Sequence, residues 1–320
     1  MTLRARIREI RMFYKSRPLF DRVLANPRAA LGLPFGVGGE FEARNGVRFR
    51  LPPAHWRLLP TFCRLAEIGA EPAIENGEKR IRIDGLELRT PVHTKAEGQY
   101  LREIFREDIY RMGERQLSGQ VVVDIGAHVG DTSLAFARHG ARVYAFEPSL
   151  ALCDYAKRNI AANPTPGSVT LFSVGLSDRA FEETIPGEHL VFVEGVSFAL
   201  ANVPANVELL KMDCEGCEYH LLAAPRFLDH LRPKAIALEY HRGGEPIAKI
   251  LESRGYEVEW DPKVEPVGML LRVGPQPDRG GAAQVAPERS STRRTSRSHA
   301  ANASATPMSS TVRLGGCNTS

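Results

Sequence analysis

The sequence predicts an α/β protein in which a doubly wound, mainly parallel sheet follows an N-terminal extension. From residue 121 onward, short apolar runs alternate with stretches of helical periodicity. Strands that are separated by crossover helices form parallel sheets. The last two predicted strands have no helix between them, so they are expected to pair as an antiparallel hairpin at one edge of the sheet.

Seven strands, four crossover helices and one preceding helix make up the predicted main domain, residues 96–274. The strands are expected at Val121–Ile125, Arg142–Phe146, Val169–Val174, Val207–Met212, Ala235–Glu239, Tyr256–Trp260 and Val267–Val273. The crossover helices are expected at Asp131–His139, Leu150–Asn163, Glu218–His230 and Glu245–Arg254, and the preceding helix at Gly98–Glu114.

Residues 1–95 are predicted to be an N-terminal extension. The first 17 residues hold six basic residues and one acidic residue, with apolar side chains at helical spacing, which predicts a basic amphipathic helix. Two interpretations stand: weak contact with a membrane surface or an acidic acceptor, and packing of the helix on its own domain. Loops and short pieces are expected over residues 25–60, where Pro and Gly are dense. Asp84-Gly85 within Ile81–Thr90 predicts a two-residue hairpin.

The formal net charge of +4 lies in the C-terminal segment. Residues 275–320 hold six arginines, one aspartate and one glutamate, so residues 1–274 carry equal numbers of basic and acidic side chains. A neutral body offers no net field to a phosphate backbone, and no specific nucleic-acid partner is expected. Residues 275–320 hold almost no large apolar side chain, so they are predicted to form a disordered basic tail.

Cysteine usage and hydropathy indicate a cytoplasmic protein. The five cysteines are irregularly spaced, so reduced thiols are expected and no disulfide framework is proposed. No apolar run reaches the roughly 18 residues of a membrane span, and the N-terminus lacks the apolar core of a secretory signal.

A glycine loop follows the first strand of the sheet, in the sequence VVVDIGAHVGD at 121–131. The strand ends at Asp124, the turn passes through Gly126 and Ala127, and Gly130 opens the next helix, so a ligand can approach the backbone. Dinucleotide-binding enzymes use such loops, but their G-x-G-x-x-G pattern is absent because His128 and Asp131 occupy the second and third glycine positions.

The charge at this loop favours a sulfonium cofactor over a pyrophosphate. A pyrophosphate would meet the like charge of Asp131 at the helix N-terminus, whereas the positive sulfonium of S-adenosylmethionine tolerates acidic neighbours. Glu147 ends the second strand 21 residues after Gly126, where a ribose diol is held. Ser177 and Asp178 follow the third strand and are candidates for the adenine edge, with a helix cap or turn as the alternative for Asp178.

The fourth and fifth strands bring candidate catalytic groups to the same edge of the sheet. Methyl transfer depends on alignment and on removal of the acceptor proton. Asp213 and His241 are the leading candidates for the general base, ahead of Glu215, while His128 is interpreted as a polar residue of the cofactor pocket. The CxxC of Cys214 and Cys217 suggests metal or redox chemistry, but no second pair completes a zinc site and no metal is expected.

Five motifs in order resemble the FkbM family of class I S-adenosylmethionine-dependent methyltransferases. They are VVVDIGAHVGD, AFEP at 145–148, the pair Asn159 and Asn163, GLSD at 175–178 and LLKMDCEGCE at 209–218, and REIFREDIYR at 102–111 resembles the family's lead-in helix. The resemblance covers about residues 104–241. It implies a seven-stranded, Rossmann-like sheet and, usually, O-methylation of sugars, polyketides or related metabolites. Phe181–Asn206 departs from the family because it is short where relatives have a further strand and helix.

The sequence therefore predicts S-adenosylmethionine-dependent O-methylation of a sugar, lipid-linked or secondary-metabolite hydroxyl. Two alternatives remain: a nucleotide-dependent oxidoreductase, and a cofactor-binding interaction protein without activity. The sequence that follows Asp213 lacks the Asp/Asn-Pro-Pro-aromatic signature of amide-nitrogen methylases of nucleic acids, which argues against a base methylase.

Overall fold

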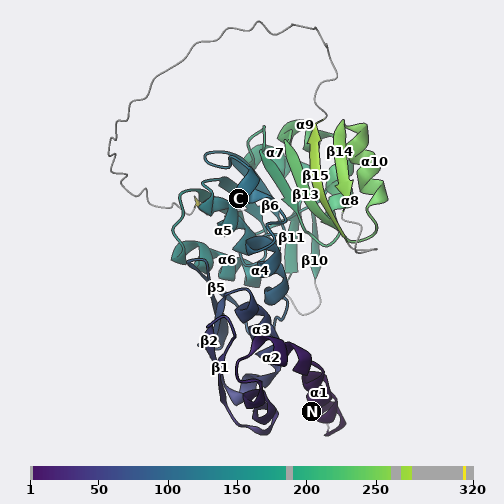
Figure 1. Cartoon of the computed structure of the whole chain (residues 1–320). Helices are drawn as coiled ribbons and strands as arrows, with labels where there is room; N and C mark the ends of the chain where they lie inside the picture. Colours follow the sequence, from purple (N-terminus) through teal and green to yellow (C-terminus); the bar gives the residue numbers. More distant parts are fainter. Residues whose placement is uncertain (1–2, 185–189, 261–267, 276–312, 315–320) are drawn as a thin grey trace, which may run out of the picture.

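The computed structural model describes residues 3–184, 190–260, 268–275 and 313–314. An eight-stranded sheet dominates the described chain, with the strand order β14-β15-β13-β12-β6-β7-β8-β16 (Figure 1). The five strands from β13 to β8 are mutually parallel, and β15 pairs antiparallel with both β13 and β14. The predicted doubly wound sheet with an antiparallel edge hairpin is therefore confirmed.

All seven predicted strands occur in this sheet, close to their expected bounds. The strands are β6 (Val121–Ile125), β7 (Arg142–Phe146), β8 (Ser168–Phe172), β12 (Leu209–Met212), β13 (Ala235–Tyr240), β14 (Tyr256–Trp260), β15 (Gly268–Pro275) and β16 (Arg313–Leu314). The eighth strand, β16, comes from the segment predicted to be a disordered tail and pairs in parallel with β8. The rest of that predicted tail, beyond Pro275 and apart from β16, lies outside the described residues.

Two apolar cores cover the two faces of the sheet, because alternate strand residues point to opposite faces. Val122 and Val143 belong to the core beneath the helices α5 and α6, while Val121 and Val123 belong to the core on the other face. The crossover helices are α5 (Asp131–Arg138), α6 (Leu150–Ala162), α8 (Cys217–Ala223), α9 (Pro225–Leu231) and α10 (Glu245–Ser253).

The helix predicted over Glu218–His230 is two helices. Pro225 has no backbone N–H and disfavours a helical conformation in the residue before it, and Ala224 is extended with φ −74° and ψ 111°. The helix predicted over Gly98–Glu114 is also too long. It ends at Phe105 as α4 (Glu97–Phe105), and the backbone then turns through positive φ at Asp108 and Arg111.

The segment after β8 builds a small second sheet beside the main one. It contains β9 (Gly175–Leu176), β10 (Phe181–Thr184), β11 (Leu190–Glu194) and the helix α7 (Val196–Asn202). Strand β11 lies between antiparallel β10 and parallel β9. Phe181–Asn206 therefore contributes two strands and a helix, although its Pro and Gly content gave no such signal.

The N-terminal unit, residues 3–67, has an apolar core of its own. Its elements are α1 (Leu3–Lys15), α2 (Arg17–Val23), the 3-10 helices η1 (Pro27–Phe35) and η2 (Pro53–Leu58), β1 (Gly39–Glu42), β2 (Arg48–Leu51) and α3 (Leu59–Glu67). The helix predicted in the first 17 residues is present. The loops expected over residues 25–60 include an antiparallel β1–β2 pair, in which the opposed residues Phe41 and Phe49 face this core.

A three-stranded sheet of β3 (Glu71–Glu75), β4 (Glu78–Ile83) and β5 (Leu86–Pro91) follows the N-terminal unit. The predicted hairpin at Asp84-Gly85 is confirmed, with φ values of 47° and 80°. The apolar side chains of β4 and β5 belong to the same core as α5 and α6. Between this sheet and β6 lie α4 and the 3-10 helix η3 (Met112–Glu114). Among the described residues, no helix is long and apolar enough to cross a membrane.

Two buried asparagines, Asn159 of α6 and Asn163 directly after this helix, cover the open edge of β5. The Asn159 side chain accepts a hydrogen bond from the Arg89 N–H at 2.8 Å and donates to the Arg89 and Val129 carbonyls. The Asn163 side chain makes the same pair of bonds with the backbone of Glu87. The amides thus take the place of a neighbouring strand and join the two sheets.

Replacing Asn159 with leucine is expected to lower the free energy of unfolding by about 3 kcal/mol, because the buried Arg89 N–H loses its acceptor. Chemical denaturation measures the loss. The matched control is Asn202→Leu, where an exposed side chain bonds only the preceding turn of α7, and a change below about 0.5 kcal/mol is expected. Equal losses in the two variants would show that the bonds to β5 contribute nothing specific.

Candidate active site

A cavity of about 780 Å³ lies at the carboxyl ends of the main strands. Strands β6, β7 and β8 lead away from this point in one direction, and β12 and β13 in the other, so the cavity occupies the topological switch point of the sheet. Six of the predicted site residues line it: Gly126, His128, Glu147, Ser177, Asp213 and Glu215. The helix α4 and the strands β10 and β11 contribute further walls.

The other predicted residues lie around the cavity. Asp124 is fully buried beneath the glycine loop, and Ala127 and Gly130 shape that loop from inside. Asp178 is exposed and accepts a hydrogen bond from the Ser177 hydroxyl at 3.1 Å. His241 lies beside the cavity, in contact with the carboxylates of its wall.

Gly126 holds the glycine loop against the end of β12. Its φ is +82°, and a Cβ added there would lie 1.7 Å from the Asp213 carbonyl oxygen, so no larger residue fits. The N–H groups of Gly126 and Ala127 both donate to the Phe146 carbonyl at the end of β7. The loop is thus fixed between the two strands that carry Asp213 and Glu147.

Lys211 of β12 stabilises this contact between the glycine loop and β12 from within the sheet. Its ammonium lies 2.9 Å from Asp124 Oδ1 and donates to the Gly126 carbonyl at 2.6 Å. Ser133 donates to the other oxygen of Asp124. Burial alone would lower the pKa of Lys211, but the charge of Asp124 raises it above its ordinary value, so the ammonium stays charged. Sequence reasoning missed Lys211, although a cation inside the apolar strand LLKM was a signal.

Glu147 is oriented by the backbone on both sides. Its Oε2 accepts from the His128 N–H and its Oε1 from the Ser149 N–H, both at 2.9 Å. Glu147 is 6% exposed, and it lines the cavity. The carboxylate is therefore fixed at the carboxyl end of β7, facing the glycine loop.

Polar groups from α4 and α5 line the end of the cavity next to α4. Asp131 is buried and accepts from the Thr132 N–H, and burial raises the pKa of its carboxyl. The Tyr100 ring lies edge-on to His128 with 5.4 Å between centroids. The Tyr100 hydroxyl is buried without a hydrogen-bond partner among the described residues. This end of the cavity therefore has polar groups with unused bonding capacity.

Four carboxylates surround His241 at the opposite side of the site. Its Nδ1 lies 3.2 Å from Oε1 of the fully buried Glu218. Its Nε2 lies 3.5 Å from Glu215, 3.8 Å from Glu239 and 3.9 Å from Asp213. Burial alone would lower the pKa of His241, but the Glu218 hydrogen bond and the nearby carboxylates raise it, which favours the imidazolium.

Glu239 is a second residue of the site that sequence reasoning missed. It lines the cavity, and burial together with the charge of Asp213 raises its pKa to about 7. A cluster of possible metal ligands lies here, formed by Asp213, Glu239 and His241. One ligand atom from each residue lies within 4.8 Å of the other two, and this spacing would suit a metal ion. An imidazolium among carboxylates accounts for the same arrangement without one.

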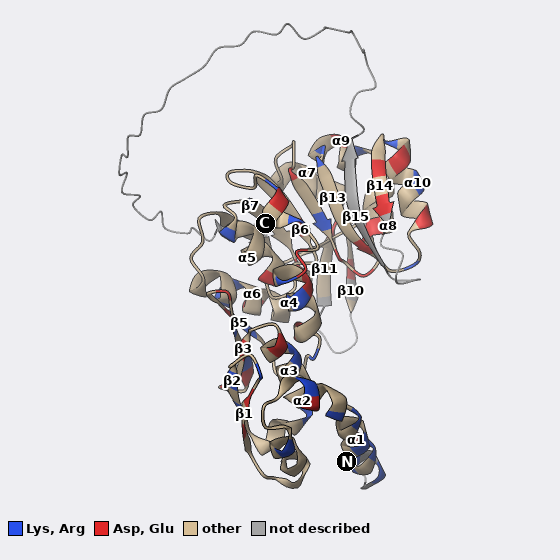
Figure 2. Cartoon of the chain, viewed as in Figure 1, with Lys and Arg blue, Asp and Glu red and all other residues tan. Residues whose placement is uncertain are grey.

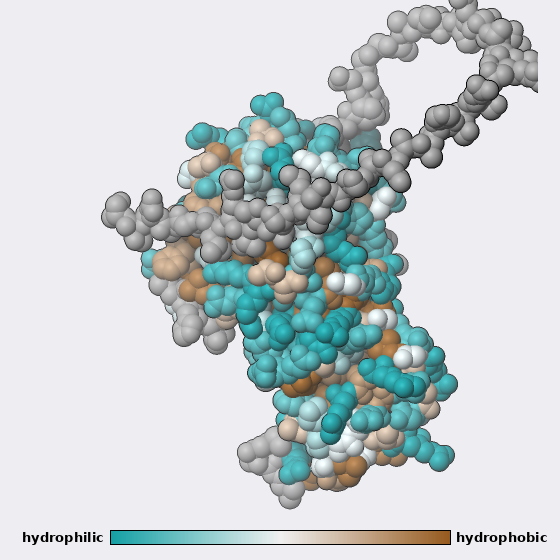
Figure 3. Space-filling model, turned by 90° about the vertical axis from the view of Figure 1, so that its left-hand side faces the viewer, coloured by the Kyte–Doolittle hydropathy of each residue, from teal (hydrophilic) through white to brown (hydrophobic). Residues whose placement is uncertain are grey.

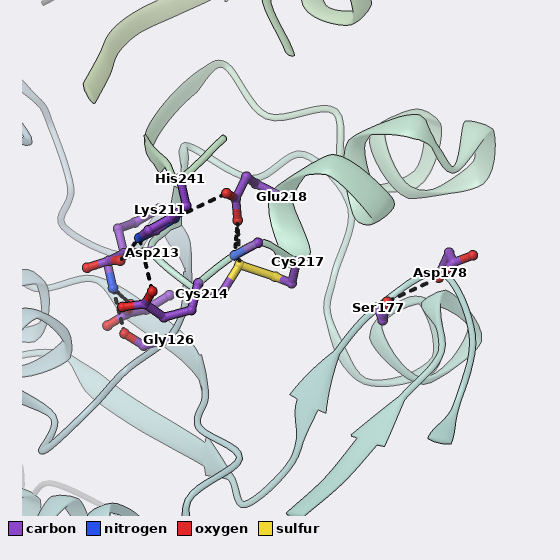
Figure 4. The surroundings of a disulfide bond; sticks show 12 residues. Gly126, Ser177, Asp178, Lys211, Asp213, Cys214, Cys217, Glu218 and His241 are labelled. Atoms are coloured by element: carbon purple, nitrogen blue, oxygen red, sulfur yellow. Dashed lines mark hydrogen bonds and ion pairs between the residues drawn. A yellow bond between two sulfur atoms is a disulfide. The ribbon is translucent and has the colours of Figure 1, made fainter. Parts of the chain in front are cut away.

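Cys214 and Cys217 form a disulfide at the start of α8 (Figure 4). The expectation of reduced thiols without a disulfide is wrong for this pair. Glu215 and Gly216 have φ values of 56° and 117°, and this turn brings the two Cα atoms to 5.5 Å. Figure 4 shows Lys211, Asp213 and His241 on one side of the disulfide. The bond leaves no thiolate here for a metal.

The main domain is a doubly wound sheet with a cavity at its carboxyl edge, and a family model matches a large part of it. Residues 124–258 match the methyltransferase FkbM domain. This match agrees with the family that the sequence motifs resemble. No curated protein matches the chain by sequence.

Solved structures that resemble the chain include several methyltransferases. One is the Pyrococcus abyssi tRNA (uracil-54, C5)-methyltransferase with S-adenosyl-L-homocysteine, at 15% identity and a TM-score of 0.40, covering 62% of this chain and 45% of that one. Another is the magnesium protoporphyrin IX methyltransferase of Synechocystis PCC 6803 with bound SAM, at 16% identity and a TM-score of 0.36, covering 56% and 82%. The chain thus spans less than half of the first of these proteins.

Replacing Lys211 with methionine is expected to lower the free energy of unfolding by about 3–5 kcal/mol, because Asp124 is left buried and unpaired. The double variant Lys211→Met/Asp124→Asn removes that charge and should recover part of the loss in chemical denaturation. The control is Lys234→Met, which breaks an exposed pair with Glu208 and should cost less than about 1 kcal/mol. A double variant no more stable than Lys211→Met would contradict the buried-pair account.

Proposed function

We propose that the chain transfers a methyl group from S-adenosylmethionine to a hydroxyl of a small or lipid-linked acceptor. The observation that carries the proposal is the single cavity that joins the glycine loop and Glu147 to the carboxylates Asp213 and Glu239. A methyl donor and an acceptor must meet in one water-poor site, with a proton acceptor within reach.

The cofactor assignment is supported by the chemistry of the loop. Glu147, already aligned by two N–H donors, would accept bonds from the ribose hydroxyls. Ser177, and beside it Asp178, would meet the adenine edge. Tyr100 and Asp131 would hold the polar end of the methionyl group. The buried carboxylate of Asp131 at the start of α5 disfavours a pyrophosphate, which speaks against the oxidoreductase alternative.

Glu239 and Asp213 are proposed to remove the acceptor proton. Glu239 lines the cavity with a pKa of about 7, which suits a general base at neutral pH. Asp213 faces the same space from the end of β12. His241 and Glu215 are proposed to position these carboxylates, since the raised pKa of His241 makes it a better cation than a base. The proton leaves the acceptor oxygen as that oxygen bonds the methyl carbon and the carbon–sulfur bond breaks.

The acceptor is proposed to be a sugar, lipid-linked or secondary-metabolite hydroxyl. Six carboxylates line the cavity, against the cations Lys211 and Arg242, and this balance disfavours a polyphosphate backbone. Phe181, Val191 and Val193 form an apolar wall from β10 and β11. An acceptor with an uncharged hydroxyl and an apolar part fits such a lining.

We further propose that residues 96–274 carry out the transfer in the cytoplasm and that residues 1–95 are an extension. The separate core of the N-terminal unit supports the division, although β3–β5 pack with the main domain. Buried Cys63 and Cys153 remain free thiols, and burial raises their pKa to about 12 and about 11, so they are unreactive.

Transfer of labelled methyl groups from S-adenosylmethionine into metabolite and lipid extracts, with mass identification of the product, tests the activity. Calorimetry with S-adenosylhomocysteine and with NAD separates the cofactors. Binding of S-adenosylhomocysteine with labelling supports the proposal. Binding without labelling of any acceptor would favour the inactive interaction protein, and binding of NAD alone would favour the oxidoreductase.

Glu147→Ala is expected to weaken binding of S-adenosylhomocysteine by roughly 10- to 100-fold, because hydrogen bonds to a charged group are worth about 1.5–3 kcal/mol. Calorimetry measures the affinity, and thermal unfolding without ligand checks the fold. Asp154→Ala, an exposed carboxylate of α6 away from the cavity, serves as the control. Unchanged affinity in Glu147→Ala would remove this residue from the cofactor site.

The second-order rate constant kcat/KM is expected to rise as the pH increases through about 7, because Glu239 must lose its proton to act as a base. Glu239→Gln should remove this rise and most of the activity while leaving the affinity for S-adenosylhomocysteine unchanged. Initial rates measured across this range test both points. A variant with the same pH profile as the parent protein would assign the base to another group.

A further inference from the structure

Charge is divided unevenly between the first part of the chain and the main body. Residues 1–37 hold eight basic and two acidic residues, whereas residues 38–274 hold 28 basic and 34 acidic ones. The neutrality of residues 1–274 as a whole therefore conceals a basic segment beside an acidic body. Figure 2 marks the basic residues in blue along α1, at the end of the molecule away from α9 and α10.

The helix α1 is fixed on one side and open on the other. Phe13 is buried against Phe20 and Trp56, and the Tyr14 hydroxyl donates to the Leu31 carbonyl at 3.1 Å. The five cations of α1 are all exposed: Arg4, Arg6, Arg8, Arg11 and Lys15. Among the described residues, no carboxylate forms an ion pair with these cations. The one acidic residue of α1, Glu9, pairs with Arg57 instead.

Large apolar side chains are exposed beside these cations. The exposed fraction is 69% for Phe35, 60% for Val37 and 57% for Met12, and Ile7 and Leu31 are also exposed. These five are the majority of the exposed large apolar side chains in the described chain. They come from α1, from η1 and from Val37 just after η1, and the Tyr14–Leu31 hydrogen bond joins α1 to η1. Figure 3 shows apolar surface among hydrophilic atoms at the lower end of the molecule.

A basic hollow lies between α1, η2 and α3. Its lining includes Arg4, Arg8, Arg57, Arg64 and Lys95, together with Trp56. Glu9 is its only carboxylate, and Glu9 is paired. Its volume of about 720 Å³ has room for an anionic headgroup. The hollow therefore offers several cations to a phosphate, next to the ring of Trp56.

We propose that the N-terminal unit binds the surface of an anionic lipid bilayer. In this arrangement α1 and η1 lie in the interface, with Phe35, Val37 and Met12 among the acyl chains and the α1 cations at the headgroup phosphates. The basic hollow receives one headgroup. The acidic body is repelled by the same surface, which sets the orientation of the molecule.

The exposed apolar side chains distinguish this surface from a nucleic-acid site. An RNA backbone is bound by cations and by aromatic rings that stack on bases, and it gains nothing from exposed aliphatic side chains such as Val37, Met12, Ile7 and Leu31. A bilayer interface uses both the cations and the aliphatic groups. A bound bilayer would also bring lipid-linked hydroxyls near the protein, which fits the acceptor class proposed above but is not needed for the docking itself.

Vesicle co-sedimentation of the full chain tests the proposal without methyl donor or acceptor, so the outcome is independent of the transfer reaction. Vesicles of phosphatidylcholine with phosphatidylglycerol should bind, and vesicles of phosphatidylcholine alone should not. Arg4→Gln/Arg8→Gln/Arg11→Gln should weaken binding roughly 100-fold, since each cation near an anionic surface contributes roughly fivefold. Phe35→Ser/Val37→Ser should weaken binding while leaving the salt dependence in place.

Two controls remove surface side chains of the same kinds elsewhere, three exposed arginines and one exposed apolar side chain. Arg138→Gln/Arg179→Gln/Arg226→Gln and Leu150→Ser should each bind as the parent protein does, and thermal unfolding confirms that every variant is folded. Equal vesicle binding by the α1 variant and the arginine control would overturn the proposal. Absence of vesicle binding, or binding to RNA that survives Phe35→Ser/Val37→Ser with no binding to vesicles, would also overturn it.

Discussion

The close approach of the glycine loop to the end of β12 is the constraint on which the site depends. Gly126 and the Asp213 carbonyl meet with no room for a Cβ, and Lys211 joins the Gly126 carbonyl to Asp124 beneath them. Two neighbouring parallel strands are thereby locked at their carboxyl ends. One end carries the glycine loop and the other carries Asp213, so a buried ion pair fixes the two proposed halves of the site relative to each other.

A second cluster, around His241, offsets the negative charge of the acidic side of the site. Asp213, Glu215, Glu218 and Glu239 gather around His241, whose raised pKa supplies a compensating positive charge. Burial, together with the nearby charge of Asp213, raises the pKa of Glu239 to about 7. An acidic cavity suits a cationic sulfonium and a neutral hydroxyl, whereas the N-terminal unit is basic and is proposed to bind an anionic surface.

Sequence periodicity predicted the sheet because its strands are buried, apolar and separated by crossover helices. It also placed Glu147 and Asp213 at the cavity, since the carboxyl ends of parallel strands share one edge. Features that depend on contacts between distant segments were missed. Glu239 became a candidate only when its distance to Asp213 and its burial were known, and Lys211 only when its partners were. The Cys214–Cys217 bond depends on positive φ at Glu215 and Gly216, which spacing alone does not reveal.

A crystal structure of the full chain with S-adenosylhomocysteine tests the central claim most directly. The account predicts the ribose hydroxyls on Glu147, the adenine beside Ser177, and the homocysteine sulfur facing the space between Asp213 and Glu239. A ligand bound with its sulfur remote from both carboxylates, or with its ribose away from Glu147, would contradict the account.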